Sequence, residues 1–237
     1  MGKDLMKDLE KELKKSVKKS VKKSAELGED LAKDLKKNAK RMGQELGADD
    51  KMYKKYRDFK SREATPILWN NKKFACIKKG RFWLSDTPHK KSKGWDERYD
   101  CYRMCTYVIL REKLKGKEFT FMNTHFVFGE NGQIKSANLI IDYSKTISDN
   151  PTFVVGDFNM GVGSGGYNAI TKYFTDANGA TVNDRRPTYN GYGKGDDHID
   201  FCFINDKVKA NDFSVIDARV NGKYASDHNG IYINLDL

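Results

Sequence analysis

The chain contains the octapeptide Thr152-Phe-Val-Val-Gly-Asp-Phe-Asn159, in which a short apolar run stops at a glycine and polar residues follow. A run of this kind predicts a buried strand over residues 152–155. Asp157 and Asn159 are two residues apart, so they lie on the same side wherever the chain stays extended. The sequence therefore predicts a strand whose end presents an acid and an amide together.

Three other segments also place polar side chains at the ends of predicted strands. Asn123 and His125 repeat the two-residue spacing at the end of an apolar segment. Asp200 opens a third apolar run, and Asp227 with His228 precedes a fourth. Burying one such group without a partner costs about 2 to 7 kcal/mol, so an apolar core does not favour them.

The combination of these groups is more informative than any one of them. A single Asp-Phe-Asn or Asn-Thr-His segment is typical of a turn or a strand cap. Several acids, imidazoles and amides at four strand ends are instead what a metal-assisted phosphoryl site requires. Carboxylates bind a hard divalent cation, an imidazole oriented by a carboxylate moves a proton, and an amide donor holds a phosphate oxygen.

Short apolar runs dominate the chain after Pro66, and they predict seven strands and two helices. The predicted strands cover residues 67–69, 73–78, 107–111, 118–122, 152–155, 199–204 and 231–235, and the predicted helices cover residues 134–148 and 168–174. Because helices separate only some of the strands, we predict a mixed α/β (α+β) sandwich rather than a regular βαβ fold.

The length and composition allow a core but no membrane span. The 237 residues are 38% apolar and 12% aromatic, which is enough to bury a sizeable interior. No apolar run approaches the roughly 20 residues of a membrane helix, and the start of the chain is too densely charged for a signal peptide. We therefore expect a soluble, cytoplasmic protein with one domain over residues 51–237 and an extension over residues 1–50.

The predicted extension has a helical, basic pattern. Residues 3–46 contain no proline, and residues 1–60 hold 19 Lys and Arg against 12 Asp and Glu, which is most of the net charge of +11. A helix of this kind binds an anionic membrane surface, an acidic partner or nucleic acid, pairs in a coiled coil, or is simply a solvated arm. Its apolar residues recur every four positions, at Leu5, Leu9, Leu13, Val17, Val21 and Ala25.

Several weaker signals are given structural interpretations. The four cysteines form no C-x-x-C pair, so we expect free thiols, with a zinc site at Cys101 and Cys105 as the alternative. The glycine-rich residues 161–167 lack a phosphate-loop ending and predict a flexible connection. His89 is expected in solvent, and His198 beside the site or at the surface.

Four motifs, in this order and at these separations, resemble the endonuclease/exonuclease/phosphatase superfamily, which includes the DNase I-like nucleases. They are Asn123-Thr-His125, Gly156-Asp-Phe-Asn159, His198-Ile-Asp200 and Ser226-Asp-His228. Additional segments resemble a bacterial-type subgroup of metal-dependent hydrolases: Arg62-Glu-Ala-Thr-Pro-Ile67, Phe82-Trp-Leu-Ser-Asp-Thr-Pro88, Gly94-Trp-Asp96 and Arg103-Met-Cys-Thr. The resemblance covers residues 62–237, and several motifs in fixed order make it specific.

This resemblance implies a four-layer αββα sandwich and a Mg²⁺-dependent phosphoesterase. It implies that His228 acts as general base or transition-state partner, oriented by Asp200. It also implies that His125 is a second catalytic imidazole paired with Glu63, and that Asp157 positions or activates the attacking water. An imidazole needs a carboxylate partner to fix its tautomer, which agrees with this assignment.

The resemblance assigns binding roles as well. Asn159 is expected to hold the scissile phosphate, and Asn123 is assigned to substrate binding. Arg103 either contacts phosphate or forms a structural ion pair. Asp227 is the expected ligand of Mg²⁺ or Mn²⁺.

The chain departs from the superfamily pattern at its start. Members usually begin with a strand carrying an Asn and then a Gln-Glu whose carboxylate is a main metal ligand, and neither is recognisable before Ile67. Glu45 follows a glutamine, but it fits an ordinary surface carboxylate better. Val127 and Gln133 replace an Asp and an Arg that are usual in the subgroup. The sequence therefore leaves open a truncated sandwich with reduced activity.

We predict a divalent-metal phosphodiesterase or nuclease that acts on nucleic acid or another phosphoester. One alternative is a phosphomonoesterase acting on lipid or sugar phosphates. Another is a catalytically impaired sandwich whose basic helical arm binds nucleic acid or membrane. The sequence does not distinguish oligomeric states.

Overall fold

A computed structural model describes residues 64–217, 219–220 and 222–237 of the chain. The predicted extension, the domain boundary at residue 51, Glu45 and Glu63 lie outside the described residues. The described helices are α3 (Glu130–Ile147) and α4 (Gly165–Ile170). The described strands are β1 (Phe74–Trp83), β2 (Met104–Glu112), β3 (Glu118–His125), β4 (Thr152–Asp157), β5 (Thr175–Asp176), β6 (Asp200–Ile204), β7 (Lys209–Ile216), β8 (Arg219–Val220), β9 (Lys223–Tyr224) and β10 (Gly230–Asp236).

Six strands form one mixed sheet in the order β1-β2-β3-β4-β6-β5. Among the described strands, β3 and β4 alone pair in parallel, and α3 makes the connection between them. A parallel pair needs such a crossover, which returns the chain to the same end of the sheet. The carboxyl ends of β3 and β4 therefore lie side by side, and the antiparallel β6 starts beside them.

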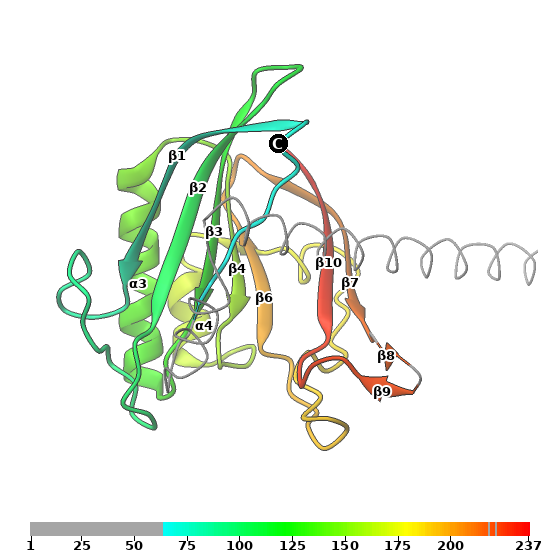
Figure 1. The fold of residues 1–237 in the computed structure, drawn as a ribbon. Helices are drawn as coiled ribbons and strands as arrows, with labels where there is room; N and C mark the ends of the chain where they lie inside the picture. Colours follow the sequence, from blue (N-terminus) through cyan, green and yellow to red (C-terminus); the bar gives the residue numbers. More distant parts are fainter. Residues whose placement is uncertain (1–63, 218, 221) are drawn as a thin grey trace, which may run out of the picture. The chain divides into compact units, whose positions relative to one another are not determined.

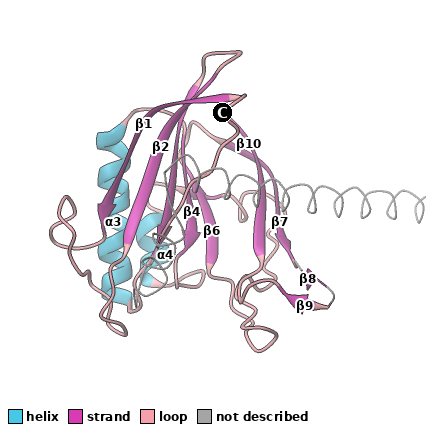
Figure 2. Cartoon of the chain, viewed as in Figure 1, coloured by secondary structure: helices cyan, strands magenta, loops and turns pink. Residues whose placement is uncertain are grey.

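The described elements form three layers (Figures 1 and 2). Helices α3 and α4 cover one face of the six-stranded sheet, and the antiparallel pair β7–β10 lies on its other face. This arrangement confirms the predicted α/β sandwich. Neither helix of the described ranges has the length and apolar character needed to cross a membrane.

Alternating side chains of the central strand β4 supply both interior surfaces. Val154 packs with Ile140 of α3 in the core on the helix side. Phe153, one residue earlier, packs on the opposite side of the sheet, where Ile233 and Leu235 of β10 also lie. Burial on both faces explains why β4 is an almost continuous apolar run.

Some elements differ from the sequence prediction. Residues 67–69 are not a strand, although Ile67 and Trp69 pack against the buried Leu110. β7 was not predicted, because only Phe213 and Val215 of its eight residues are buried. Several predicted strands are longer in the structure, because hydrogen bonding to the neighbouring strands also includes polar residues at their ends.

The glycine-rich segment is more ordered than predicted. Ser164 caps α4 by accepting a hydrogen bond from the Tyr167 N–H, so Gly165 and Gly166 form its first turn. The helix therefore begins and ends earlier than the predicted helix over residues 168–174. A small residue is needed at Gly166, because an added Cβ would lie 2.7 Å from Gln133 and 2.8 Å from Met160.

Gly156 is the position in β4 where only glycine fits. Its φ is 150°, and an added Cβ would lie 1.9 Å from the Thr124 carbonyl oxygen of β3. This close approach of two backbones precedes Asp157 directly. Gly156 therefore controls how the end of β4 is presented.

We expect Gly156→Ala to lower the free energy of unfolding by about 2 to 4 kcal/mol, because strain and overpacking add at this site. Gly161→Ala is the matched control, since its Cβ would meet no atom within 4 Å. The control should change stability by less than about 0.5 kcal/mol. Urea unfolding measures both, and equal effects of the two changes would contradict the packing argument.

Candidate active site

Three neighbouring strands place three ionisable side chains in one row. His125 ends β3, Asp157 ends β4 and Asp200 begins β6, and the sheet register pairs His125 with Asp157 and Asp157 with Asp200. Residues paired across neighbouring strands point to the same face of a sheet. The row is therefore a direct product of strand register.

His228 reaches this row from the loop before β10. Tyr189 forms bridges to both Asp197 and His228, and its ring meets the His228 ring edge-on at 5.2 Å. The N–H groups of Asn190 and Gly191 donate to the Asp227 carbonyl. The loop that carries His228 is thus fixed by backbone hydrogen bonds to a neighbouring segment.

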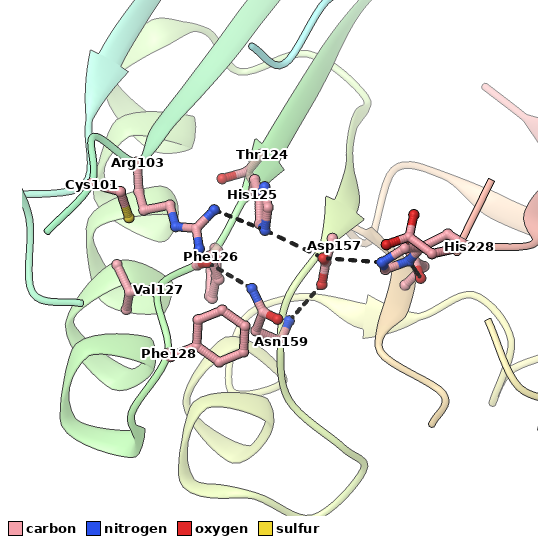
Figure 3. A network of polar contacts seen from close by, with 12 residues as sticks. Cys101, Arg103, Thr124, His125, Phe126, Val127, Phe128, Asp157, Asn159 and His228 are labelled. Atoms are coloured by element: carbon pink, nitrogen blue, oxygen red, sulfur yellow. Dashed lines mark hydrogen bonds and ion pairs between the residues drawn. The ribbon is translucent and has the colours of Figure 1, made fainter. Parts of the chain in front are cut away.

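Asp157 lies between the two imidazoles (Figure 3). Its Oδ2 is 3.3 Å from His125 Nε2 and 3.7 Å from His228 Nε2. The other ring nitrogen of His228, Nδ1, is 2.8 Å from Asp200 Oδ2. With Nδ1 donating to Asp200, a neutral His228 has its Nε2 lone pair directed toward the Asp157 side.

The environment shifts the pKa values of two of these groups. The hydrogen bond to Asp200 raises the pKa of His228 above its ordinary value, against the opposing effect of desolvation. Burial raises the pKa of Asp157, and the charge of Asp200 adds to this effect, whereas both imidazoles oppose it. Shifted pKa values of adjacent groups in a cavity are typical of functional sites.

Arg103 lies behind His125. Its side chain is 2% exposed, its Nη1 is 2.9 Å from His125 Nε2, and its Nε is 3.3 Å from the buried Asp96 carboxylate. A guanidinium can only donate, so His125 Nε2 must accept this hydrogen bond. While Nε2 accepts this hydrogen bond it cannot also donate to Asp157, so the 3.3 Å contact between these two side chains is not a hydrogen bond from Nε2.

Asn159 is held firmly next to the row. Its N–H donates to Asp157 Oδ1 at 2.9 Å, and its side-chain amide donates to the Phe126 carbonyl at 3.0 Å. Gln133 Nε2 donates to the Asn159 carbonyl at 2.7 Å. Gln133, which we noted only as a departure from the subgroup, therefore supports the backbone of Asn159, whose φ is 49°.

A cavity of about 730 Å³ opens over these groups. This volume exceeds what one phosphate needs and is in the usual range for small-molecule sites. It is lined by Arg98, Tyr99, Asp100, Cys101, Arg103, His125, Phe128, Asp157, Asn159, Tyr189, Asp197, Ile199, Asp227 and His228.

One predicted site residue lies elsewhere. Asn123 does not line the cavity, and its side-chain amide donates to the Pro66 carbonyl at 2.8 Å, so it holds the segment before β1. His198 contacts the Arg186 carbonyl and the Asn178 side-chain amide. His89 is exposed.

The described residues offer oxygen donors suited to Mg²⁺ but too few of them. Asp227 and Asp197 both line the cavity, and carboxylates are the ligands that this ion prefers. However, the described ranges contain no group of three or more His, Cys, Asp or Glu side chains that could hold a metal ion. The residues described do not by themselves fit a Mg²⁺ or Mn²⁺ site. The described ranges likewise contain no metal-binding group at Cys101 and Cys105, the alternative zinc site.

Comparison with known proteins gives the same fold. No protein-family model matches the sequence, and no curated protein matches it. A solved endonuclease/exonuclease/phosphatase from Bacteroides vulgatus is 29% identical, with 71% of this chain and 68% of that chain covered and a TM-score of 0.65. The family protein from Bacteroides thetaiotaomicron is 26% identical, with coverages of 71% and 68% and a TM-score of 0.64. The chain therefore has the fold of the endonuclease/exonuclease/phosphatase superfamily, to which these solved structures belong.

More distant structures of the superfamily share the fold. A mannosyl-6-phosphatase of Bacteroides thetaiotaomicron is 24% identical, with 71% of this chain and 69% of that chain covered and a TM-score of 0.62. The D. rerio TDP2, solved with a single-strand DNA product, is 14% identical, with 70% of each chain covered and a TM-score of 0.54.

Sequence reasoning missed some residues that shape this site. Asp96 was noted only as part of a motif, yet its carboxylate binds Arg103. Tyr189 and Asp197 lie in a turn-rich stretch without a strand pattern, so only their bridges reveal them. Arg98 had no distinguishing signal beyond its charge.

We expect nuclear magnetic resonance titration, with a chelator present, to give a His228 pKa above the ordinary 6.5, and Asp200→Asn to lower it. A group whose pKa is raised in the folded state contributes stability that is fully present below its unfolded pKa. This stability is lost as the pH rises through the folded pKa. Asp200→Asn should therefore destabilise the protein more at about pH 5.5 than at about pH 9.

The matched control is Asp212→Asn, which changes an exposed carboxylate of β7. It should leave the titration of His228 unchanged. A His228 titration that is the same in wild type and Asp200→Asn would show that this pair does not form in solution.

Proposed function

We propose that this protein is a phosphoester hydrolase that cleaves phosphodiesters, with nucleic acid as the first substrate to test. The proposal rests on one observation: Asp157 Oδ2 lies 3.3 Å and 3.7 Å from the Nε2 atoms of His125 and His228, inside a cavity. The resemblance to the superfamily supports the general chemistry.

His228 is proposed to take a proton from the attacking water. Its Nδ1 is 2.8 Å from Asp200, so a neutral ring directs its Nε2 lone pair toward Asp157. The positive charge that forms on the ring is then stabilised by two carboxylates. Orientation and general-base action together typically contribute about 10²- to 10⁴-fold to a rate.

Asp157 and Asn159 are proposed to position the reacting groups. Asp157 Oδ2 faces both imidazoles, so a water bound there would be within reach of His228. The Asn159 side-chain amide has two N–H groups, and only one donates to the Phe126 carbonyl. The other is proposed to hold an oxygen of the scissile phosphate.

His125 and Arg103 are proposed to act on the phosphate side of the site. Arg103 donates to His125 Nε2, which holds the ring in one orientation. Arg103 lines the cavity, and its positive charge is proposed to stabilise the negative charge of a phosphate bound there. Charge stabilisation of this kind is usually the largest contribution to phosphoryl transfer.

We expect His228→Ala and Asp157→Ala to lower turnover by about 10²- to 10⁴-fold, because each removes a group in the proton-transfer path. His89→Ala is the control, since His89 is exposed and does not line the cavity. Release of nitrophenolate from bis(p-nitrophenyl) phosphate and p-nitrophenyl phosphate, and cleavage of plasmid DNA and RNA, measure turnover. Equal turnover by all four proteins would exclude the proposed site, and cleavage of the monoester alone would favour the phosphomonoesterase.

We also propose that hydrolysis requires Mg²⁺ or Mn²⁺. This part of the proposal is supported by the resemblance to the superfamily. We expect EDTA to lower hydrolysis by at least about 100-fold and added Mg²⁺ to restore it, because phosphoester charge must be neutralised during attack. Asp227→Asn should raise the Mg²⁺ concentration needed for half-maximal activity. Activity that survives chelation and dialysis would contradict the metal requirement.

A further inference from the structure

One wall of the cavity is anchored by a single buried carboxylate. Asp96 Oδ1 accepts from the N–H groups of Arg98 and Tyr99 at 2.9 and 2.7 Å, and its Oδ2 accepts from the Phe128 N–H at 3.0 Å. The side chain of Asp96 is only 1% exposed, and it also binds Arg103. Burial would raise the pKa of Asp96, but these N–H donors together with Arg103 lower it, so the carboxylate stays ionised.

The three residues anchored in this way contact one another through their side chains. The Arg98 guanidinium carbon lies 5.4 Å from the centre of the Tyr99 ring and 5.3 Å from that of Phe128. The two rings meet edge-on, with their centres 5.4 Å apart. Cation–aromatic contacts of this length hold a guanidinium without neutralising it.

Arg98 has an uncompensated charge at the cavity. Within the described ranges it forms no ion pair, and two nearby acids have other partners: Asp100 pairs with Lys93, and Asp96 with Arg103. Both Arg98 and Tyr99 are exposed, so a bound molecule can reach them. A planar, unpaired guanidinium is the side chain best suited to bind a phosphate through two hydrogen bonds.

The same cavity therefore combines two kinds of chemistry. His125, Asp157 and His228 provide the reacting groups, and the residues Arg98, Tyr99 and Phe128 provide a cation and two flat apolar surfaces. A cavity of about 730 Å³ leaves space beyond the scissile phosphate for the rest of a substrate.

We propose that Arg98 is a specificity-determining residue that binds a second phosphate of the substrate, with Tyr99 and Phe128 contacting the group between the two phosphates. The substrate class is a phosphoester whose organic part carries another phosphate. A nucleic-acid strand and a small bisphosphate both supply this chemistry. The proposal rests on the proposed hydrolase function.

The experiment compares two esters that differ only in the second phosphate. They are thymidine 5′-(p-nitrophenyl phosphate) and the same compound with a 3′-phosphate. We expect wild type to show the higher kcat/KM on the 3′-phosphorylated ester. Arg98→Gln should reduce this preference about tenfold, because it removes a charge-assisted hydrogen bond to phosphate.

Arg81→Gln is the matched control. Arg81 is also an exposed arginine over an aromatic ring, 5.9 Å from the centre of Trp83, but it does not line the cavity. The control should keep the wild-type preference, and Arg98→Lys should restore part of it. Arg98→Gln lowering kcat/KM equally for both esters, or leaving the preference unchanged, would overturn the proposal.

Calorimetry separates this proposal from the proposed function. Binding of thymidine 3′,5′-bisphosphate and thymidine 5′-monophosphate needs no turnover. We expect wild type to bind the bisphosphate more tightly, and Arg98→Gln to reduce this advantage in affinity without weakening binding of the monophosphate. If wild type releases no nitrophenolate but this advantage depends on Arg98, the hydrolase proposal fails and the binding site stands. If hydrolysis occurs without any dependence on Arg98, the binding site fails alone.

A final comparison distinguishes the two sources of the second phosphate. A 3′-methyl phosphate ester of the first compound carries an internal phosphodiester, as a nucleic-acid strand does. If kcat/KM for this ester and for the ester with the terminal phosphate depends equally on Arg98, the second phosphate comes from a nucleic-acid strand. Dependence on the terminal phosphate alone assigns a small bisphosphate.

Discussion

Lateral hydrogen bonding among β3, β4 and β6 places His125, Asp157 and Asp200 side by side, and the rest of the site depends on this register. A slip by one residue would turn these side chains to the helix-covered face. Gly156 maintains the register at its tightest point, where two backbones come too close for any Cβ. Gly156, which close packing requires, thus directly precedes Asp157, the acid of the site.

Asp96 has a comparable role for the part of the cavity that contains Arg98, Tyr99 and Phe128. Its buried carboxylate binds three backbone N–H groups and Arg103, so one side chain fixes both the Arg98 segment and the guanidinium behind His125. Breaking a buried ion pair by removing one partner typically costs about 3 to 5 kcal/mol. The shape of the wall and the orientation of His125 are therefore linked through one anion.

The sequence predicted the parts that depend on local pattern. The apolar run of β4, the polar residues at its end and the helix α3 follow from periodicity, and the order of the motifs indicated the superfamily. It did not predict β7, because three of its first four residues are polar and the strand forms by pairing with β10. Nor could it show that Asn123 binds the Pro66 carbonyl or that Arg103 donates to His125, because both contacts join segments distant in the chain.

The central claim is that Asp157 and His228 act as one unit, and a double-mutant cycle on kcat/KM tests it most directly. When two groups act in the same step, removing either one removes most of their joint contribution to kcat/KM. We therefore predict that the double variant Asp157→Asn, His228→Ala is little worse than the poorer single variant. Losses that multiply, as expected for two independent groups, would contradict it.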